Sequence, residues 1–191
     1  MKSLALVFGL ASLLAAPAVA QSSTWNIDAA HSEVDFATTH MMVSKVHGRV
    51  GGLKGAIQLD EKDISKSTVS LTLDVSTIDT GVGARDTDIK GASWFDVAKF
   101  PTATFTSTQV TGAGKDLHIT GNLTLHGVTK PVELDAQGPT GPAPGMDHKP
   151  HAGFSATGTI NRKDFGIGAN FPEGAVSNEV KLTIDLEVVK Q

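Results

Sequence analysis

Apolar and polar residues alternate with a period of two along most of the chain from Thr24 onward. The clearest case is 69–76, where Val, Leu, Leu and Val alternate with Ser, Thr, Asp and Ser. Such alternation is typical of a β-strand with one buried and one solvated face. The pattern returns in seven further stretches, which are 34–36, 56–59, 103–107, 119–125, 132–136, 154–160 and 180–188. The sequence therefore predicts about eight strands.

Short turn signals separate several of these strands. They lie at 60–63, 112–116 and Gly127, and each is short enough to join antiparallel neighbours. Eight antiparallel strands can close into a barrel, which removes the edge strands. A barrel of this size either fills with its own side chains or holds one small ligand. We therefore predict an all-β fold, an eight-stranded antiparallel barrel, and leave open whether its interior is solid.

Three segments interrupt the alternation. His40–His47 could form two helical turns, and 85–99 opens with charged residues, carries Trp94-Phe95 and stops before Pro101. We expect one or two short helices, or structured crossovers, there. Segment 137–151 contains four prolines and three glycines, which predicts an exposed loop.

The first twenty residues have the three parts of a secretory signal. These are Lys2, an apolar run over 4–14 and the small-residue sequence Ala18-Val19-Ala20. A membrane anchor is the alternative, but the run is shorter than the roughly 20 residues that a spanning helix needs. We expect cleavage after Ala20, a periplasmic mature chain over 21–191 and no stable membrane anchor.

Composition excludes several classes of protein. The 191 residues include no cysteine, which excludes disulfides, thiolate metal sites, lipidated cysteine and a cysteine nucleophile. The formal charge is −4, and the chain has no tyrosine and no basic cluster. These features argue against nucleic-acid binding.

Candidate chemistry is sparse. The serine-hydrolase motifs G-x-S-x-G and S-x-x-K and the zinc motif H-E-x-x-H do not occur. Of the seven histidines, we expect His148 and His151 to be solvated in the proline-rich loop. His31 and His40 are expected to hydrogen-bond backbone groups at the two ends of the first strand. The sequence thus predicts no catalytic residue, no metal site and no cofactor.

Several spaced blocks of residues together resemble a known family. They are Trp25-x-Ile27-Asp28-x-x-His31-Ser32, Val43-Ser44-x-Val46-x-Gly48, Ser76-x-Ile78-Asp79-Thr80-Gly81, Arg85-Asp86, Trp94-Phe95-Asp96, Gly127-Val128-Thr129-Lys130-Pro131-Val132 and Ile160-Asn161-Arg162-x-Asp164-Phe165-Gly166. In this order, they make the mature chain similar to the YceI-like, polyisoprenoid-binding proteins of bacterial envelopes.

The resemblance implies a lipocalin-like barrel whose apolar tunnel holds an isoprenoid, an isoprenoid quinone or a fatty-acyl chain, without catalysis. The apolar phase of the strands, together with Trp94 and two methionines suited either to a lid or to gap filling, gives the candidate lipid-binding residues. They are Phe36, Met41, Met42, Leu71, Leu73, Trp94, Phe105, Leu123, Phe154, Ile160 and Ile184.

Two other functions stay open at this point. One is an envelope enzyme or redox partner that uses His31, His40 or Asp88 beside a bound lipid or quinone. The other is a structural stress-response protein. The expected partner is a lipid ligand, and a homodimer is the one protein partner that we consider.

Overall fold

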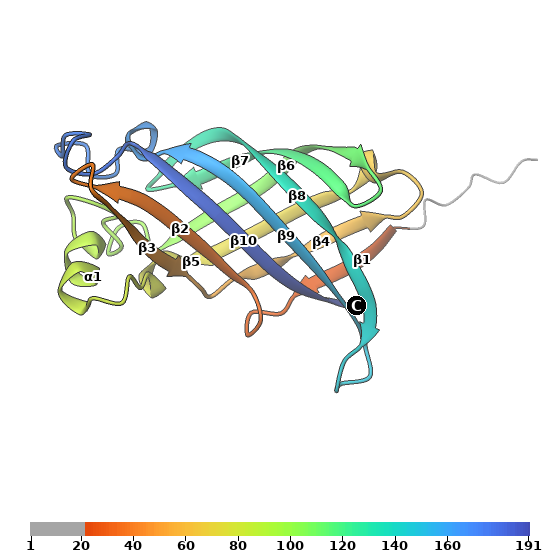
Figure 1. Cartoon of the computed structure of the whole chain (residues 1–191). Coiled ribbons are helices and arrows are strands. Elements are labelled where there is room, and N and C mark those ends of the chain that lie inside the picture. Colours follow the sequence, from red (N-terminus) through yellow and green to blue (C-terminus); the bar gives the residue numbers. More distant parts are fainter. Residues whose placement is uncertain (1–21) are drawn as a thin grey trace, which may run out of the picture.

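The computed structural model describes residues 22–191, and the expected leader lies outside this part of the chain. Ten antiparallel strands wrap around one interior (Figure 1). The strands are β1 (Ser22–Ile27), β2 (Glu33–His40), β3 (Ser44–Val50), β4 (Lys54–Asp60), β5 (Thr68–Asp74), β6 (Thr102–Ala113), β7 (Asp116–Leu125), β8 (Val128–Pro144), β9 (Pro150–Asn161) and β10 (Glu179–Lys190).

The ten strands fill eight positions in the barrel wall. β10 pairs first with β1, through Ile27 and Val188, and then with β2, through Val34 and Ile184. β4 likewise pairs with β1, and β3 pairs with β2. Two wall positions are therefore each built from two consecutive strands. The β1–β10 pairing closes the sheet, so the predicted eight-stranded antiparallel barrel is confirmed.

All eight predicted strands are present, and β1 and β3 are additional. The expected helix over 40–47 is wrong, because Met41 and Met42 form a tight turn and β3 follows. Both methionines have left-handed φ values, 52° and 59°, and Val43 N donates to His40 O at 3.0 Å. A turn whose two central residues both have positive φ matches the twist of paired strands.

The expected loop over 137–151 is also wrong in most of its length. β8 runs to Pro144 and β9 starts at Pro150, so the two strands form a hairpin that projects beyond the barrel (Figure 1). The pairing shifts register between Gln137 and Thr140, and again before Ala143. Bulges of this kind accommodate prolines, which cannot donate to the ladder.

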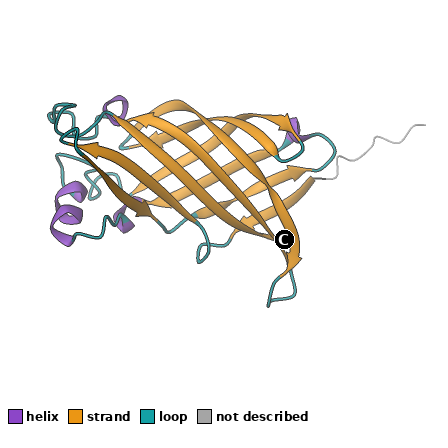
Figure 2. Ribbon diagram, in the orientation of Figure 1, coloured by secondary structure: helices purple, strands orange, loops and turns teal. Residues whose placement is uncertain are grey.

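Helical segments are few, and most gather at one end of the barrel (Figure 2). The α-helix α1 (Gly83–Lys90) covers the first part of the segment where a helix was expected, and the rest of that segment forms turns. The remaining helical pieces are the 3₁₀ turns η1 (Ile64–Lys66), η2 (Val75–Thr77) and η3 (Arg162–Phe165). Within residues 22–191, none of the helices has the length and apolar character needed to cross a bilayer.

Candidate functional site: an apolar cavity inside the barrel

Two cavities lie end to end inside the barrel. The mouth cavity, beneath α1 and the β2–β3 turn, has a volume of about 440 Å³, and the inner cavity has about 110 Å³. Both are lined by the same four residues, which form the neck between them: Val34, Leu73, Leu123 and Leu182. Along β10, Val180 lines the mouth cavity and Leu186 the inner one, which are about 20 Å apart at strand rise.

The inner cavity is almost wholly apolar. Apart from Ser67 and Ser155, every residue that lines it has a hydrocarbon or aromatic side chain. A charged or unpaired polar group would pay a large desolvation cost in such a space. The inner cavity therefore suits a hydrocarbon chain and no charged group.

Nine of the eleven candidate lipid-binding residues line these cavities. Three line the mouth cavity only, namely Phe36, Trp94 and Ile160. Four line the inner cavity only, namely Leu71, Phe105, Phe154 and Ile184. The other two, Leu73 and Leu123, belong to the neck. Met41 and Met42 line neither cavity. They are 55% and 80% exposed at the tip of the β2–β3 hairpin, so gap filling, one of the two roles considered for them, is wrong.

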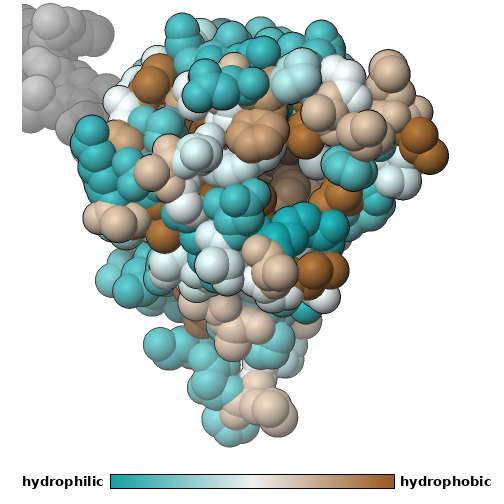
Figure 3. Space-filling model, turned by 90° about the vertical axis from the view of Figure 1, so that its left-hand side faces the viewer, coloured by the Kyte–Doolittle hydropathy of each residue, from teal (hydrophilic) through white to brown (hydrophobic). Residues whose placement is uncertain are grey.

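Trp25 is part of the core on β1, on the side of the barrel remote from α1 (Figure 1). Its ring is 3% exposed and faces the interior beside Ile57, with which it is paired across β1 and β4. The Lys190 ammonium lies 5.5 Å from the ring centre, and the indole N–H donates to Ser23 Oγ at 2.8 Å. The opposite end is hollowed, and Figure 3 shows hydrophobic residues within the depression. The mouth cavity thus opens at the end that carries α1.

Arg162 organises the loop at this entrance. Its buried guanidinium donates to five backbone carbonyl oxygens at 2.6–3.1 Å, those of Ile167, Gly168, Phe171, Val176 and Ser177. These bonds use all five of its N–H groups. Burial lowers the pKa of Arg162, which nonetheless stays charged at neutral pH. The ring of Phe171 stacks on Trp94 at 4.4 Å, so the same loop also supplies part of the cavity wall.

A second polar network holds α1 over the mouth cavity. Arg85 donates from Nε to Thr80 Oγ1 at 2.7 Å and from Nη2 to Thr80 O at 2.9 Å. Asp86 accepts from the backbone N–H and the hydroxyl of Thr80, at 2.9 and 2.6 Å. The hydroxyl bond is the main cause of the lowered pKa of Asp86. Arg85 and Asp88 line the cavity here, so charged side chains lie beside its opening.

Two glycines make room for aromatic rings in the wall. A Cβ built on Gly48 would collide with the ring of Phe36, its partner across β2 and β3. A Cβ on Gly121 would collide with the ring of Phe105 and would come within 2.8 Å of a backbone oxygen. Both rings line cavities, so these glycines help to set the cavity shape.

The histidines do not form one catalytic site with Asp88. His40 and Asp88 line the mouth cavity, whereas His31 lies at the opposite end of β2 and contacts Asp28 at 2.9 Å. That contact is with a carboxylate, where a backbone partner was expected. His151 was expected to be solvated, but its side chain is only 19% exposed and contacts two carboxylates.

Comparison with known proteins agrees with this architecture. A family model described as YceI-like domain matches residues 25–188. The chain is 41% identical over 197 residues to Protein YceI of Salmonella newport, and the match covers the whole of both chains. The chain belongs to the YceI-like family.

Two solved structures resemble the barrel closely. The YCEI protein of Campylobacter jejuni aligns with a TM-score of 0.71 and 28% identity, over 80% of this chain and 90% of that one. A polyisoprenoid binding domain from Saccharophagus degradans aligns with a TM-score of 0.66 and 17% identity, over 90% of this chain and all of that one. The second likeness, at this identity, concerns the fold alone.

Sequence reasoning missed parts of the site. Val34 and Leu182 lay on the predicted apolar face of their strands, and only the closed barrel shows that they form the neck. Arg162 was noted as part of a family block without a role. A single arginine after a strand gives no sign, in the sequence, that five backbone carbonyl groups surround it in the fold.

Proposed function

We propose that the mature protein binds one extended apolar lipid chain in the barrel and carries it in the periplasm without chemical change. The ligand class is a polyisoprenoid, an isoprenoid quinone or a fatty-acyl lipid. The observation that carries the proposal is the pair of adjoining cavities, of about 440 and 110 Å³, with an apolar inner end. No resident cofactor is needed for this role.

Burial of hydrocarbon supplies enough free energy for such binding. Each CH₂ transferred from water contributes about 0.8 kcal/mol. A dozen carbons thus contribute on the order of 10 kcal/mol before the costs of ordering the chain are subtracted. A charged contact is not required for stable carriage.

The polarity of the two cavities sets the orientation of the lipid. The inner cavity has no charged lining residue, whereas His40, Arg85 and Asp88 line the mouth cavity. The apolar end of the chain therefore enters first. The head group stays at the mouth, where polar side chains and water can solvate it.

Two further observations support this proposal. The Saccharophagus degradans domain that shares the fold is described as polyisoprenoid binding. The apolar run and Ala18-Val19-Ala20 at the start of the chain fit export and cleavage. An intact mass that begins at Gln21 in a periplasmic fraction is the expected result, and exported protein that retains residues 1–20 would contradict it.

A fluorescent fatty-acid probe tests the cavity as the binding site. Ala103 is 4% exposed and lines the mouth cavity, so Ala103→Trp should fill part of that space and weaken probe binding at least tenfold. Val43→Trp adds the same ring at a position that is 86% exposed and should leave binding unchanged. Equal affinities in the two folded variants would contradict binding in this cavity.

A further inference from the structure

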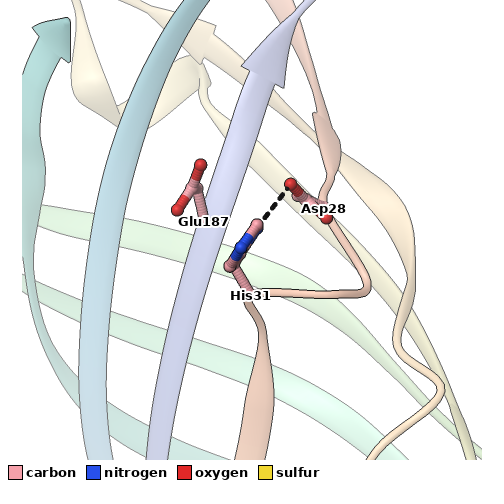
Figure 4. A group of neighbouring side chains, drawn as sticks. All are labelled: Asp28, His31 and Glu187. Atoms are coloured by element: carbon pink, nitrogen blue, oxygen red, sulfur yellow. Dashed lines mark hydrogen bonds and ion pairs between the residues drawn. The ribbon is translucent and has the colours of Figure 1, made fainter. Parts of the chain in front are cut away.

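A cluster of histidine and carboxylate side chains lies where the β1–β2 turn meets β10 (Figure 4). None of its three residues lines the mouth cavity. Asp28 and His31 belong to the turn between β1 and β2, and Glu187 belongs to β10. One candidate ligand atom of each residue lies within 4.8 Å of the other two. Glu187 points outward because its neighbour Leu186 lines the inner cavity and successive strand residues face opposite sides.

The main chain fixes the three residues relative to one another. The backbone N–H of Asp28 donates to Glu187 O at 2.9 Å. Ser32 Oγ accepts from Glu187 N at 3.0 Å and donates to Glu187 O at 3.2 Å. The turn that interrupts the barrel wall is thus attached to β10 at the residue that supplies the third side chain.

His151, from β9, holds the Glu187 carboxylate from its other side. Its Nδ1 lies 2.6 Å from Glu187 Oε1, and its Nε2 lies 2.9 Å from Asp147 Oδ1. Carboxylates that ligate metals are themselves hydrogen-bonded by outer partners, which orient them. His151 has this relation to Glu187, and its side chain is only 19% exposed.

The donor set has the chemistry of a zinc site. One imidazole nitrogen and two carboxylate oxygens are suitable ligands for Zn²⁺, with bonds of about 2.0–2.2 Å, and a water molecule can complete a tetrahedron. Ligand atoms on such an ion lie about 3.4 Å apart. His31 Nδ1 and Asp28 Oδ2 are 2.9 Å apart, and the candidate Glu187 oxygen lies within 4.8 Å of both, so side-chain rotations alone can bring the three atoms to this spacing.

We propose that Asp28, His31 and Glu187 bind one divalent transition-metal ion, of the zinc type, on the outer wall of the barrel. The ion would join the β1–β2 turn to β10 and so secure the break in that wall position. Binding to the folded state alone stabilises it by mass action. The site shares none of its three ligands with the lipid cavities, so the two proposals stand or fall separately.

The chain offers a matched control on the same outer surface. His118 lies 3.0 Å from Asp135 and 4.0 Å from Glu133, all on neighbouring strands β7 and β8. Within residues 22–191, the group of Asp28, His31 and Glu187 is the one in which three such ligand atoms converge. His118→Gln removes a similar histidine–carboxylate contact without touching that group.

Calorimetric titration of the chelator-treated protein with zinc chloride tests the proposal. A histidine ligand must be neutral, so the titration is run at about pH 8, above the ordinary pKa of histidine. One zinc ion per chain is expected. His31→Gln and Glu187→Gln should each weaken binding at least tenfold, and His118→Gln should not change it.

Thermal melting and lipid content, measured on the same preparations, distinguish loss of the metal site from loss of the fold. Zinc should raise the melting temperature of the wild type and of His118→Gln but not of His31→Gln, while all retain bound lipid. Folded wild-type protein that binds zinc only at millimolar concentration would overturn the proposal. An equal loss of affinity in His118→Gln would overturn it as well, since binding would then be spread over surface histidines.

Discussion

The guanidinium carbon of Arg162 lies 5.7 Å from the centre of the Trp94 ring. A desolvated cation over an indole is worth on the order of 2 kcal/mol. The same arginine donates hydrogen bonds to five carbonyl oxygens of the 167–177 loop. The two residues thus connect the loop around the entrance to the wall of the mouth cavity.

Arg162→Met should destabilise the fold strongly. The methionine fills much of the volume but leaves five buried carbonyl oxygens without their donor, so we expect a loss of about 3 kcal/mol or more. Urea unfolding measures this loss as a change in the free energy of unfolding. Lys163→Met, at the exposed neighbouring residue, should change the free energy of unfolding by less than about 0.5 kcal/mol. Similar losses in both variants would show that the carbonyl network is not what holds the loop.

Phe36→Ala should change which lipids the protein selects. Removing a ring that lines the mouth cavity enlarges the space, so longer or bulkier chains should be retained. Mass spectrometry of extracted lipids gives the distribution. Met42→Ser, at the exposed hairpin tip, should leave that distribution unchanged. If Met42→Ser alters it and Phe36→Ala does not, the hairpin tip rather than the cavity governs selection.

Gly121→Ala should cost about 1–3 kcal/mol of unfolding free energy, because the new methyl group collides with the Phe105 ring and approaches a backbone oxygen. Gly83→Ala is the matched substitution at the start of α1, where a Cβ meets nothing within 4 Å. That variant should gain about 0.4–1 kcal/mol. A neutral Gly121→Ala would mean that the aromatic ring is free to move aside.

The contact between Asp86 and Thr80 should make the entrance sensitive to acid. The Thr80 hydroxyl holds the pKa of Asp86 below its ordinary value of 3.8 in the folded state. A lowered folded-state pKa gives stability that is present above the unfolded value and is lost as pH falls through the folded one. Asp86→Asn should therefore destabilise at pH 7 and have little effect in strong acid. A carboxyl pKa at or above 3.8 in an NMR titration would contradict this.

The fold was predictable because strand alternation reports directly which face of each strand is buried. Val69, Leu71 and Leu73 show it clearly, and all three line the cavities. The segment over 40–47 was not predictable in the same way. Its apolar run fits a helix, and only the left-handed φ values of Met41 and Met42 reveal the hairpin.

Most candidate residues that line the cavities could be predicted from the sequence, but the residues that join the parts of the site could not. Eight inward positions follow from the period of two, but the neck and the hub at Arg162 depend on which strands become neighbours. The outer cluster was missed for the same reason. His151 and Glu187 are far apart in sequence, and they meet only because β9 and β10 pair in the register that opposes Glu187 to Gly153.

Native mass spectrometry of the processed protein, purified without detergent from a bacterial periplasm, tests the central claim most directly. We expect a complex of one chain with one lipid, whose mass after release matches a polyisoprenoid, a quinone or a fatty-acyl chain. The complex should be depleted in Ala103→Trp and intact in Val43→Trp. A folded wild-type protein that carries no lipid, or equal lipid content in both tryptophan variants, would contradict the account.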